Sequence, residues 1–271
     1  MELIDKEKLE IEKKLKFFED PDFSFNEDLH VYKYRGEKFE SVTTFLKKFK
    51  VPFDKKYWAE KKARERMVPV EVVYSEWEEK GNVANDLGTK VHKWIEDFWS
   101  GLSPIVPEGE DNEECLDRIN KFLRIYDRKL KFLIPIRSEL RVFSKKWKLA
   151  GTIDQLFIFW DAKKQKVVIV IGDWKTNGDF KSDSHKKGKY KKLLRPFAGL
   201  YENHHNEYSI QISLYRLILE EELGIETESG FLCHIGPEDE AKIYPAKDLR
   251  EPLKAYLDHN RDYSQIDIFD V

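Results

Sequence analysis

The sequence predicts one α/β domain with a helical N-terminal portion, and three observations carry this prediction. Two segments in the middle of the chain, Thr152–Trp160 and Val167–Lys175, are rich in Val, Ile, Phe and Trp, as buried strands are. Segments with helical spacing lie on both sides of them, at 83–100 and Tyr208–Leu223. The 271 residues contain no internal repeat, low-complexity tract or linker, so a single domain spanning 1–271 is the simplest interpretation.

The first quarter of the chain predicts helices around one hairpin. Residues 1–20 read as a charged amphipathic helix. His30–Phe45 alternates as a β-hairpin does, with Gly36 in the turn. Residues 42–66 read as a helix that is broken near Pro52, because proline cannot continue a helix.

The segment 83–100 has the clearest helical pattern. Five of its residues recur at i, i+3, i+4, i+7 and i+11, which is one face of a helix. These are Gly88, Val91, His92, Ile95 and Trp99. A loop at 101–111, rich in Pro and Gly, leads to a second helical segment at 112–132.

The second half of the chain alternates strands and helices. A short strand is predicted at Ser138–Phe143, before the two central strands. The segment 178–205 is polar, basic and poorly periodic, and Gly224 ends the helix that follows it. Two short strands and a final helix complete the chain, at Gly230–Ile235, Lys242–Pro245 and Leu249–Asp262.

The composition excludes two broad classes of protein. Hydrophobic residues make up 41% and aromatic residues 14%, too many for a disordered chain. The longest apolar run, Val167–Ile171, is far shorter than the ~18 residues of a transmembrane helix. The 48 Lys and Arg nearly balance 51 Asp and Glu, so a net charge of −3 neither favours nor excludes a nucleic-acid partner.

The N-terminus and the cysteines predict a cytosolic protein. Residues 1–20 have neither the apolar core of a signal peptide nor the acid-poor character of a transit peptide. Cys115 and Cys233 are the only cysteines. Two are too few for a four-cysteine zinc or iron–sulfur site, and a disulfide is not expected in a reducing compartment.

Three charged residues interrupt the two central strands. Asp154 lies in the first strand, and Asp173 and Lys175 lie at the end of the second. Buried strands rarely carry ionised groups unless these are paired or bind metal. A turn within 161–166 places Asp154 opposite Asp173 on one face, with Cβ atoms ~5 Å apart, and Lys175 shares that face.

This arrangement predicts a cation site. Two facing carboxylates are destabilising unless a positive charge lies between them. A lysine neutralises one carboxylate, whereas a divalent cation neutralises both, and hard oxygen ligands suit Mg²⁺ or Mn²⁺. The alternative interpretation is a solvated hairpin end with an ordinary surface ion pair.

Four short motifs follow one another in the order of a known family. They are G-T-K-V-H (88–92), G-T-I-D (151–154), D-W-K (173–175) and Q-I-S-L-Y (211–215). The ordered set resembles the RecB-like branch of the PD-(D/E)XK nucleases. Residues 30–45 are similar to the start of phage and bacterial single-domain exonucleases of this kind. The resemblance spans roughly residues 28–220, with Trp174 where an acidic residue can precede the lysine.

The resemblance implies a mixed central β-sheet flanked by helices, a restriction-endonuclease-like core. The expected subdivision is an N-terminal helical and hairpin elaboration at 1–82, a catalytic core at 83–235, and a C-terminal strand and helix at 236–271.

The resemblance also implies roles for individual residues. Asp154 and Asp173 are the expected ligands of one or two Mg²⁺ or Mn²⁺ ions, with His92 completing the site. Trp174 can contribute only a backbone carbonyl. Lys175 is expected to orient the attacking water or to stabilise the charge of the reacting phosphate, and the alternative is a salt bridge to Asp173. The alternative for His92 is a hydrogen-bonded residue of the core. An iron–sulfur cluster, which this branch sometimes carries, is not expected here.

Four further residues have two open interpretations each. Glu96, one turn after His92, is either a metal ligand or the partner of a basic neighbour. Glu139, on the strand before Asp154, is either a further ligand or an outer acidic group. Gln211 and Tyr215 resemble family residues that hold the active site and the nucleic acid, and the alternative is an ordinary polar edge of a core helix.

The segment Lys181–Arg195 predicts a nucleic-acid contact. It contains seven Lys or Arg and one Asp, and basic residues with interleaved aromatics suit phosphate contact and base stacking. The alternative is a solvated loop. The residues expected to contact nucleic acid are Lys181, Lys186, Lys187, Lys189, Tyr190, Lys191, Lys192 and Arg195.

These expectations combine into a functional hypothesis. The leading one is a metal-dependent deoxyribonuclease, an exonuclease of replication, recombination or repair, acting on DNA in the cytoplasm of a bacterium or of a phage's host. Expected protein partners are a recombinase, a helicase or a single-strand-binding protein, and no membrane is expected. The rivals are a structure-specific endonuclease, a nucleic-acid-binding module with a vestigial site, and an accessory subunit of a recombination complex.

Overall fold

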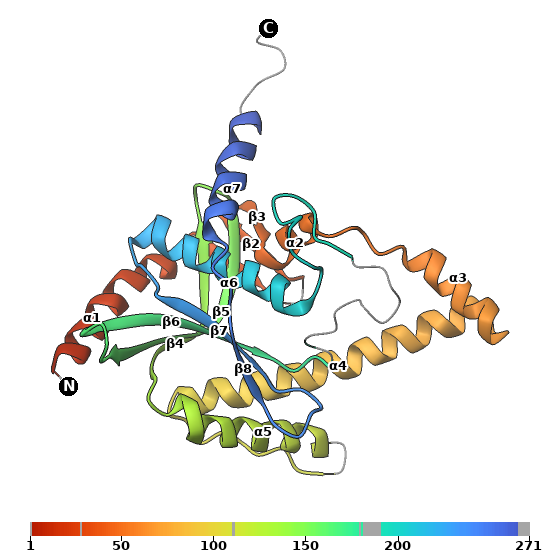
Figure 1. Ribbon diagram of the computed structural model, residues 1–271, viewed down its shortest axis with the longest axis horizontal. Helices are drawn as coiled ribbons and strands as arrows, with labels where there is room; N and C mark the ends of the chain where they lie inside the picture. Colours follow the sequence, from red (N-terminus) through yellow and green to blue (C-terminus); the bar gives the residue numbers. More distant parts are fainter. Residues whose placement is uncertain (1, 28, 110–111, 179, 181–190, 265–271) are drawn as a thin grey trace, which may run out of the picture.

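A mixed sheet of eight strands organises the molecule, with helices on both of its faces (Figure 1). The computed structural model describes residues 2–27, 29–109, 112–178, 180 and 191–264. The α/β class and the helix-flanked mixed sheet predicted from the sequence are therefore confirmed.

The N-terminal elements confirm the predicted helix and hairpin. Ser41 ends the hairpin and begins a helix, because its Oγ accepts a hydrogen bond from the backbone nitrogen of Thr44 at 3.1 Å. A strand that was not predicted, β1, adds to the hairpin edge. The elements are α1 (Glu2–Leu15), η1 (Lys16–Glu19), β1 (Phe23–Asn26), β2 (Val31–Tyr34), β3 (Glu37–Ser41), α2 (Val42–Leu46) and η2 (Lys47–Phe49).

Two helices, α3 (Lys55–Arg66) and α4 (Val70–Trp99), extend from the body as a pair (Figure 1). Helix α4 begins 13 residues before the predicted start at 83, because Val73 packs in a small apolar cluster with Ala59 and Ala63 of α3. The expected boundary between 82 and 83 therefore falls inside a continuous helix and does not separate two units.

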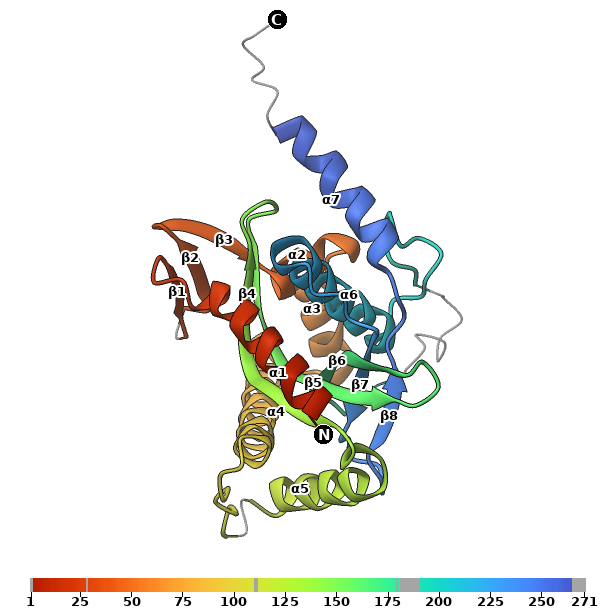
Figure 2. The same cartoon turned by 90° about the vertical axis from the view of Figure 1, so that its left-hand side faces the viewer.

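The remaining elements follow the predicted order with small shifts at their ends. They are α5 (Glu113–Ile125), η4 (Tyr126–Leu130), β4 (Ile134–Ser144), β5 (Leu149–Asp161), β6 (Lys166–Lys175), α6 (His204–Leu223), β7 (Ser229–His234), β8 (Lys242–Pro245) and α7 (Arg250–Ser264). Helix α7 points away from the rest of the molecule in both views (Figure 2). No helix among the described residues is long and apolar enough to cross a membrane.

The three longest strands form the middle of the sheet. Strands β4, β5 and β6 pair antiparallel, and β6 pairs parallel with β7. The β5–β6 register runs from Asp161↔Lys166 to Gln155↔Gly172, which is the register predicted from the turn position. Strand β3 pairs parallel with Leu149 and Ala150 of β5, on the edge that β6 occupies farther along the strand, and β8 closes the sheet beyond β7.

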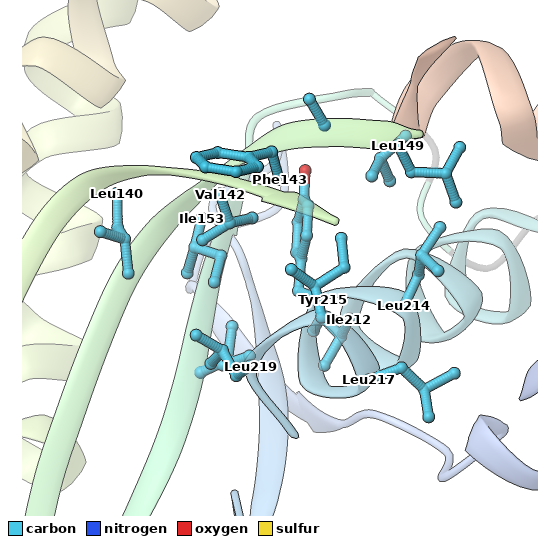
Figure 3. Packing of buried hydrophobic residues seen from close by; sticks show 14 of the residues in the cluster. Leu140, Val142, Phe143, Leu149, Ile153, Ile212, Leu214, Tyr215, Leu217 and Leu219 are labelled. Atoms are coloured by element: carbon cyan, nitrogen blue, oxygen red, sulfur yellow. The ribbon is translucent and has the colours of Figure 1, made fainter. Parts of the chain in front are cut away.

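Each face of the sheet buries its own hydrophobic core. On one face, Leu156 and Ile158 of β5 belong to a cluster with residues of α1, α6 and α7. Figure 3 shows side chains of α6, Tyr215 among them, packed against the β4–β5 hairpin. On the opposite face, Phe157 belongs to a cluster supplied by α4 and α5. Cys115 and Cys233 are buried free thiols within this second cluster, in agreement with the expected absence of a disulfide.

Candidate metal centre

The candidate site begins where strands β5 and β6 separate. Their ladder ends at Gln155↔Gly172, while β6 continues beside β7 as far as Lys175↔His234. The backbone nitrogen of Trp174 donates a hydrogen bond of 2.9 Å to Oδ2 of Asp154. The Asp154 carboxylate is therefore held where the two strands separate.

Strand β4 brings Glu139 to the other side of Asp154. The residues on either side of Glu139 pair as Ser138↔Gln155 and Leu140↔Ile153. Glu139 therefore lies opposite Asp154 across the β4–β5 ladder. Its backbone φ of 45° lies in the left-handed region, which is uncommon for a residue with a side chain. Such a conformation persists only where the surrounding structure maintains it, and here the ladder continues on both sides.

Helix α4 supplies the third group. Val91 and Ile95 are buried in the α4–α5 core, and His92 between them is 29% exposed, with Nδ1 3.7 Å from Oδ2 of Asp154. Gly88, one turn earlier, allows close approach, because a Cβ there would lie 3.2 Å from Oγ1 of Thr176. The G-T-K-V-H motif thus places a close contact at Gly88 and a candidate ligand, His92, on successive turns of α4.

His92, Glu139 and Asp154 each offer one ligand atom, and these atoms all lie within 4.8 Å of one another. One imidazole nitrogen and two carboxylates are a donor set that suits Mn²⁺ or Mg²⁺. The structure thus brings together three of the predicted ligands, including Glu139, for which the sequence left two roles open.

Asp173 does not belong to that group and forms a buried ion pair instead. Its Oδ2 lies 2.7 Å from Nζ of Lys175, and the side chain is 2% exposed. Its Oδ1 accepts no hydrogen bond from any described residue. The Lys175 ammonium also lies 4.5 Å from the ring centroid of Tyr208 on α6, so two neighbours orient it.

The carboxyl groups of Asp154, Asp173 and Glu139 all have raised pKa values. Burial raises the pKa of Asp154, and burial with the nearby charge of Asp154 raises the pKa of Asp173 to about 6. Loss of surrounding water and the charges of Asp154, Glu96 and Asp173 raise the pKa of Glu139. The cluster therefore tends to take up protons when no cation neutralises it.

The two basic groups are shifted in opposite directions. Burial, reinforced by the positive charge of Lys175, lowers the pKa of His92, so its ring is neutral at pH 7 and able to offer a lone pair. Burial opposes the charge of Lys175, but the carboxylates of Asp173 and Asp154 outweigh it and raise its pKa. Lys175 therefore stays protonated and can donate hydrogen bonds but cannot serve as a base.

Two other expected ligands have clear partners. Glu96 receives a hydrogen bond of 3.1 Å from Lys93, which is the basic-neighbour alternative, and its charge acts on Glu139. The Trp174 ring is buried against Phe122, with ring centroids 5.6 Å apart. Trp174 thus contributes its backbone N–H to Asp154, and a ligand role for its carbonyl stays a prediction.

Gln211 and Tyr215 face the β4–β5 hairpin from α6. Nε2 of Gln211 donates to the Tyr215 hydroxyl at 3.3 Å, and both side chains are buried. A Cβ at Gly151 would lie only 2.8 Å from Cε1 of Tyr215. The first residue of G-T-I-D and the last of Q-I-S-L-Y are therefore packed together, and this contact is consistent with a supporting role for Tyr215.

The basic segment is only partly described. Lys181, Lys186, Lys187, Lys189 and Tyr190 lie outside the described residues. Of the others, Lys191 donates to Oε1 of Glu202 at 2.9 Å, Lys192 lies 5.7 Å from the Tyr201 ring centroid, and Arg195 is exposed. The nucleic-acid contacts expected of this segment stay a prediction.

A groove of about 1580 Å³ is lined by two of the candidate ligands, His92 and Glu139. It follows α4 from Glu76 to Glu96, and its other walls include Glu139, Arg141 and Thr152 of the β4–β5 hairpin. A groove beside a cluster of ligands is where an extended substrate can reach a metal.

Sequence reasoning missed two residues that lie near the predicted ones. Arg141 lines the groove two residues after Glu139. Because residues two apart on a strand share a face, its spacing from Glu139 could have placed it there. Tyr208 lies three residues before Gln211, which is the same helix face, and that spacing could have placed it near Lys175.

No family model matches the chain, and no curated protein is significantly similar to it.

Proposed function

We propose that the chain is a divalent-metal-dependent deoxyribonuclease that hydrolyses phosphodiester bonds to 5′-phosphate and 3′-hydroxyl ends. The observation that supports this most strongly is the group of His92, Glu139 and Asp154 with ligand atoms within 4.8 Å, beside the buried pair of Asp173 and Lys175. A metal site whose candidate ligands His92 and Glu139 line a groove, with a preorganised cation beside it, has the parts that phosphodiester hydrolysis needs.

The residues fit a hard divalent cation. The carboxyl groups of Glu139, Asp154 and Asp173 have raised pKa values and the imidazole of His92 is neutral, so added positive charge relieves the repulsion among the carboxylates. His92, Glu139 and Asp154 are the proposed ligands, and Asp173 stays a further candidate through its Oδ1. A Mg²⁺ or Mn²⁺ ion bound there supplies Lewis acidity, which lowers the pKa of water and neutralises phosphate charge.

Lys175 has the remaining chemical role in this proposal. Because it is held by Asp173 and by the Tyr208 ring, its ammonium is oriented before substrate arrives. It donates hydrogen bonds toward a phosphate oxygen as negative charge develops there, or toward the attacking water. One such preorganised donor typically contributes a factor of about 10²–10³ to the rate.

The finer parts of the proposal rest on the resemblance of the four motifs to RecB-like nucleases. From it we infer exonuclease action on DNA in replication, recombination or repair. From the same resemblance we infer that a recombinase, a helicase or a single-strand-binding protein is its partner. The spacing of the motifs supports it, since residues of all four lie in or beside the candidate site.

The test is digestion of DNA labelled at the 5′ or 3′ end, single-stranded and double-stranded, by the purified chain. Mg²⁺ and Mn²⁺ are compared with EDTA, and closed circular DNA separates exonuclease from endonuclease action. Asp154→Asn is expected to abolish cleavage. Asp161→Asn is the matched control, because Asp161 is the last residue of β5 and lies outside the group of candidate ligands.

Absence of metal-dependent cleavage of every substrate by the parent chain would overturn the proposal. Equal cleavage by the parent and by Asp154→Asn would do so as well, because the activity would then come from elsewhere.

A further inference from the structure

Arg141 lines the groove beside the proposed metal ligands. It follows Glu139 by two residues on β4, a distance of about 7 Å along a strand, and pairs across the ladder with Thr152 of β5. Its side chain is 48% exposed. The guanidinium is thus accessible to a substrate that occupies the groove.

The Arg141 guanidinium is held in a defined orientation. Its Cζ lies 5.2 Å from the ring centroid of Phe25, which stacks in turn on Tyr32 at 4.3 Å. Tyr32 is buried and its hydroxyl lies 3.1 Å from Oγ1 of Thr152. An aromatic stack anchored on β5 therefore supports the guanidinium plane from the side of the N-terminal hairpin.

The other cationic side chains that line the groove near the candidate metal centre are held more firmly by their partners than Arg141 is. Lys93 contacts Glu96 at 3.1 Å and Asp97 at 2.9 Å. Arg118 is 3% exposed and donates to Ile235. By contrast, Arg141 pairs at 3.0 Å with Glu27, whose side chain is 76% exposed, and such a solvated pair is readily exchanged for a phosphate.

We propose that Arg141 binds a backbone phosphate of the substrate strand next to the scissile one, with Phe25 as the residue that positions it. The inference rests on the proposed nuclease function and adds a substrate contact to it. Planar guanidinium groups bind phosphate through two parallel hydrogen bonds, and only one nitrogen of Arg141 is engaged by Glu27.

The test measures binding of a single-stranded oligonucleotide at several salt concentrations, with Ca²⁺ in place of Mg²⁺ to limit cleavage. Arg141→Gln is expected to weaken binding roughly tenfold and to reduce the slope of log K against log salt by about 0.7. Arg137→Gln is the matched control. It lies on the same strand, is 43% exposed and pairs at 3.0 Å with Glu19, but does not line the groove.

Two further variants separate charge from orientation. Glu27→Gln releases Arg141 and is expected to strengthen binding about twofold to threefold, a gain that loss of structure does not produce. Its control is Glu19→Gln, the partner of Arg137, with no change expected. Phe25→Leu keeps the charge, so the salt slope should persist while kcat/KM falls.

Each outcome decides one of the two proposals. If the parent chain does not cleave DNA, the proposed function is wrong and this inference fails with it. If the parent cleaves, but Arg141→Gln matches Arg137→Gln in affinity and salt slope, only the phosphate contact is overturned. Thermal unfolding of Arg141→Gln shows whether the variant is folded, and Glu27→Gln decides the question if it is not.

Discussion

Nζ of Lys175 lies 2.7 Å from Oδ2 of Asp173, and both side chains are largely withdrawn from solvent. The two residues are neighbours on one strand, yet one is a candidate ligand and the other a proposed hydrogen-bond donor. Their different charges allow their roles to be separated experimentally.

Lys175→Ala is expected to retain Mn²⁺ binding and to slow cleavage by about 10²–10³, because it removes a donor but no ligand. Asp173→Ala is expected to weaken Mn²⁺ binding and to abolish cleavage. Calorimetric titration with Mn²⁺ and single-turnover cleavage measure the two effects. Equal loss of metal affinity in both variants contradicts the assigned roles.

Lys175→Ala should also destabilise the metal-free protein by about 3 kcal/mol, since it leaves a buried carboxylate without its partner. Lys166→Ala, at the exposed start of the same strand, is the control. Its pair with Glu228 at 3.5 Å is solvated, so a change below about 1 kcal/mol is expected. Chemical unfolding in EDTA compares the two variants.

The pH dependence of stability should reveal the raised pKa of Asp173. The pKa of an aspartate is near 3.8 in the unfolded chain, whereas burial raises the pKa of Asp173 to about 6 in the folded state. The folded state therefore binds more protons between these two pH values. Stability of the metal-free protein therefore falls as pH rises from about 4 to about 6. Asp173→Asn removes this contribution, so its stability relative to the parent should improve across that window.

Thermal unfolding of both proteins in EDTA at pH 4 to 8 measures the difference. Added Mn²⁺ should reverse the trend for the parent, because metal binding favours the deprotonated carboxylates. A constant difference between parent and Asp173→Asn across the window contradicts the raised pKa.

Gly151→Ala should destabilise the protein by roughly 1–3 kcal/mol, because the added Cβ meets the Tyr215 ring at 2.8 Å. Gly81→Ala is the matched control within helix α4, where nothing lies within 4 Å of a Cβ, and it should stabilise by about 0.5–1 kcal/mol. Combining Gly151→Ala with Tyr215→Leu should cost less than the sum of the two single changes. Strict additivity would show that the two residues do not compete for space.

Replacing Lys186, Lys187, Lys191 and Lys192 by Ala should weaken DNA binding and flatten its salt dependence. A slope reduced by ~3 to 4 units is expected if all four contact phosphates. Lys191 already pairs with Glu202 at 2.9 Å, so Lys191→Ala alone should change the slope least of the four single variants. An unchanged slope for the quadruple variant would show that these lysines do not contact DNA.

The β5–β6 hairpin shows what local pattern could predict. Two segments of β-forming residues separated by a short turn have few possible registers, and a slip by one residue would move Asp154 to the opposite face. The observed pairing of Gln155 with Gly172 agrees with the predicted one. Helix ends were predicted less well, since the start of α4 depends on packing against α3, which the residue pattern at 83–100 does not contain.

The sequence by itself determined the α/β class, the hairpin register and the set of residues from which the candidate site is built. Periodicity, turn length and residue type act over short stretches of chain, so these features are readable without a structure. Only the tertiary structure decided that the candidate ligand atoms of His92, Glu139 and Asp154 lie together while Asp173 pairs with Lys175. It likewise decided that Arg141 stacks on Phe25 at the groove. These contacts join segments far apart in the chain, and their geometry depends on how a helix and a hairpin pack against the sheet.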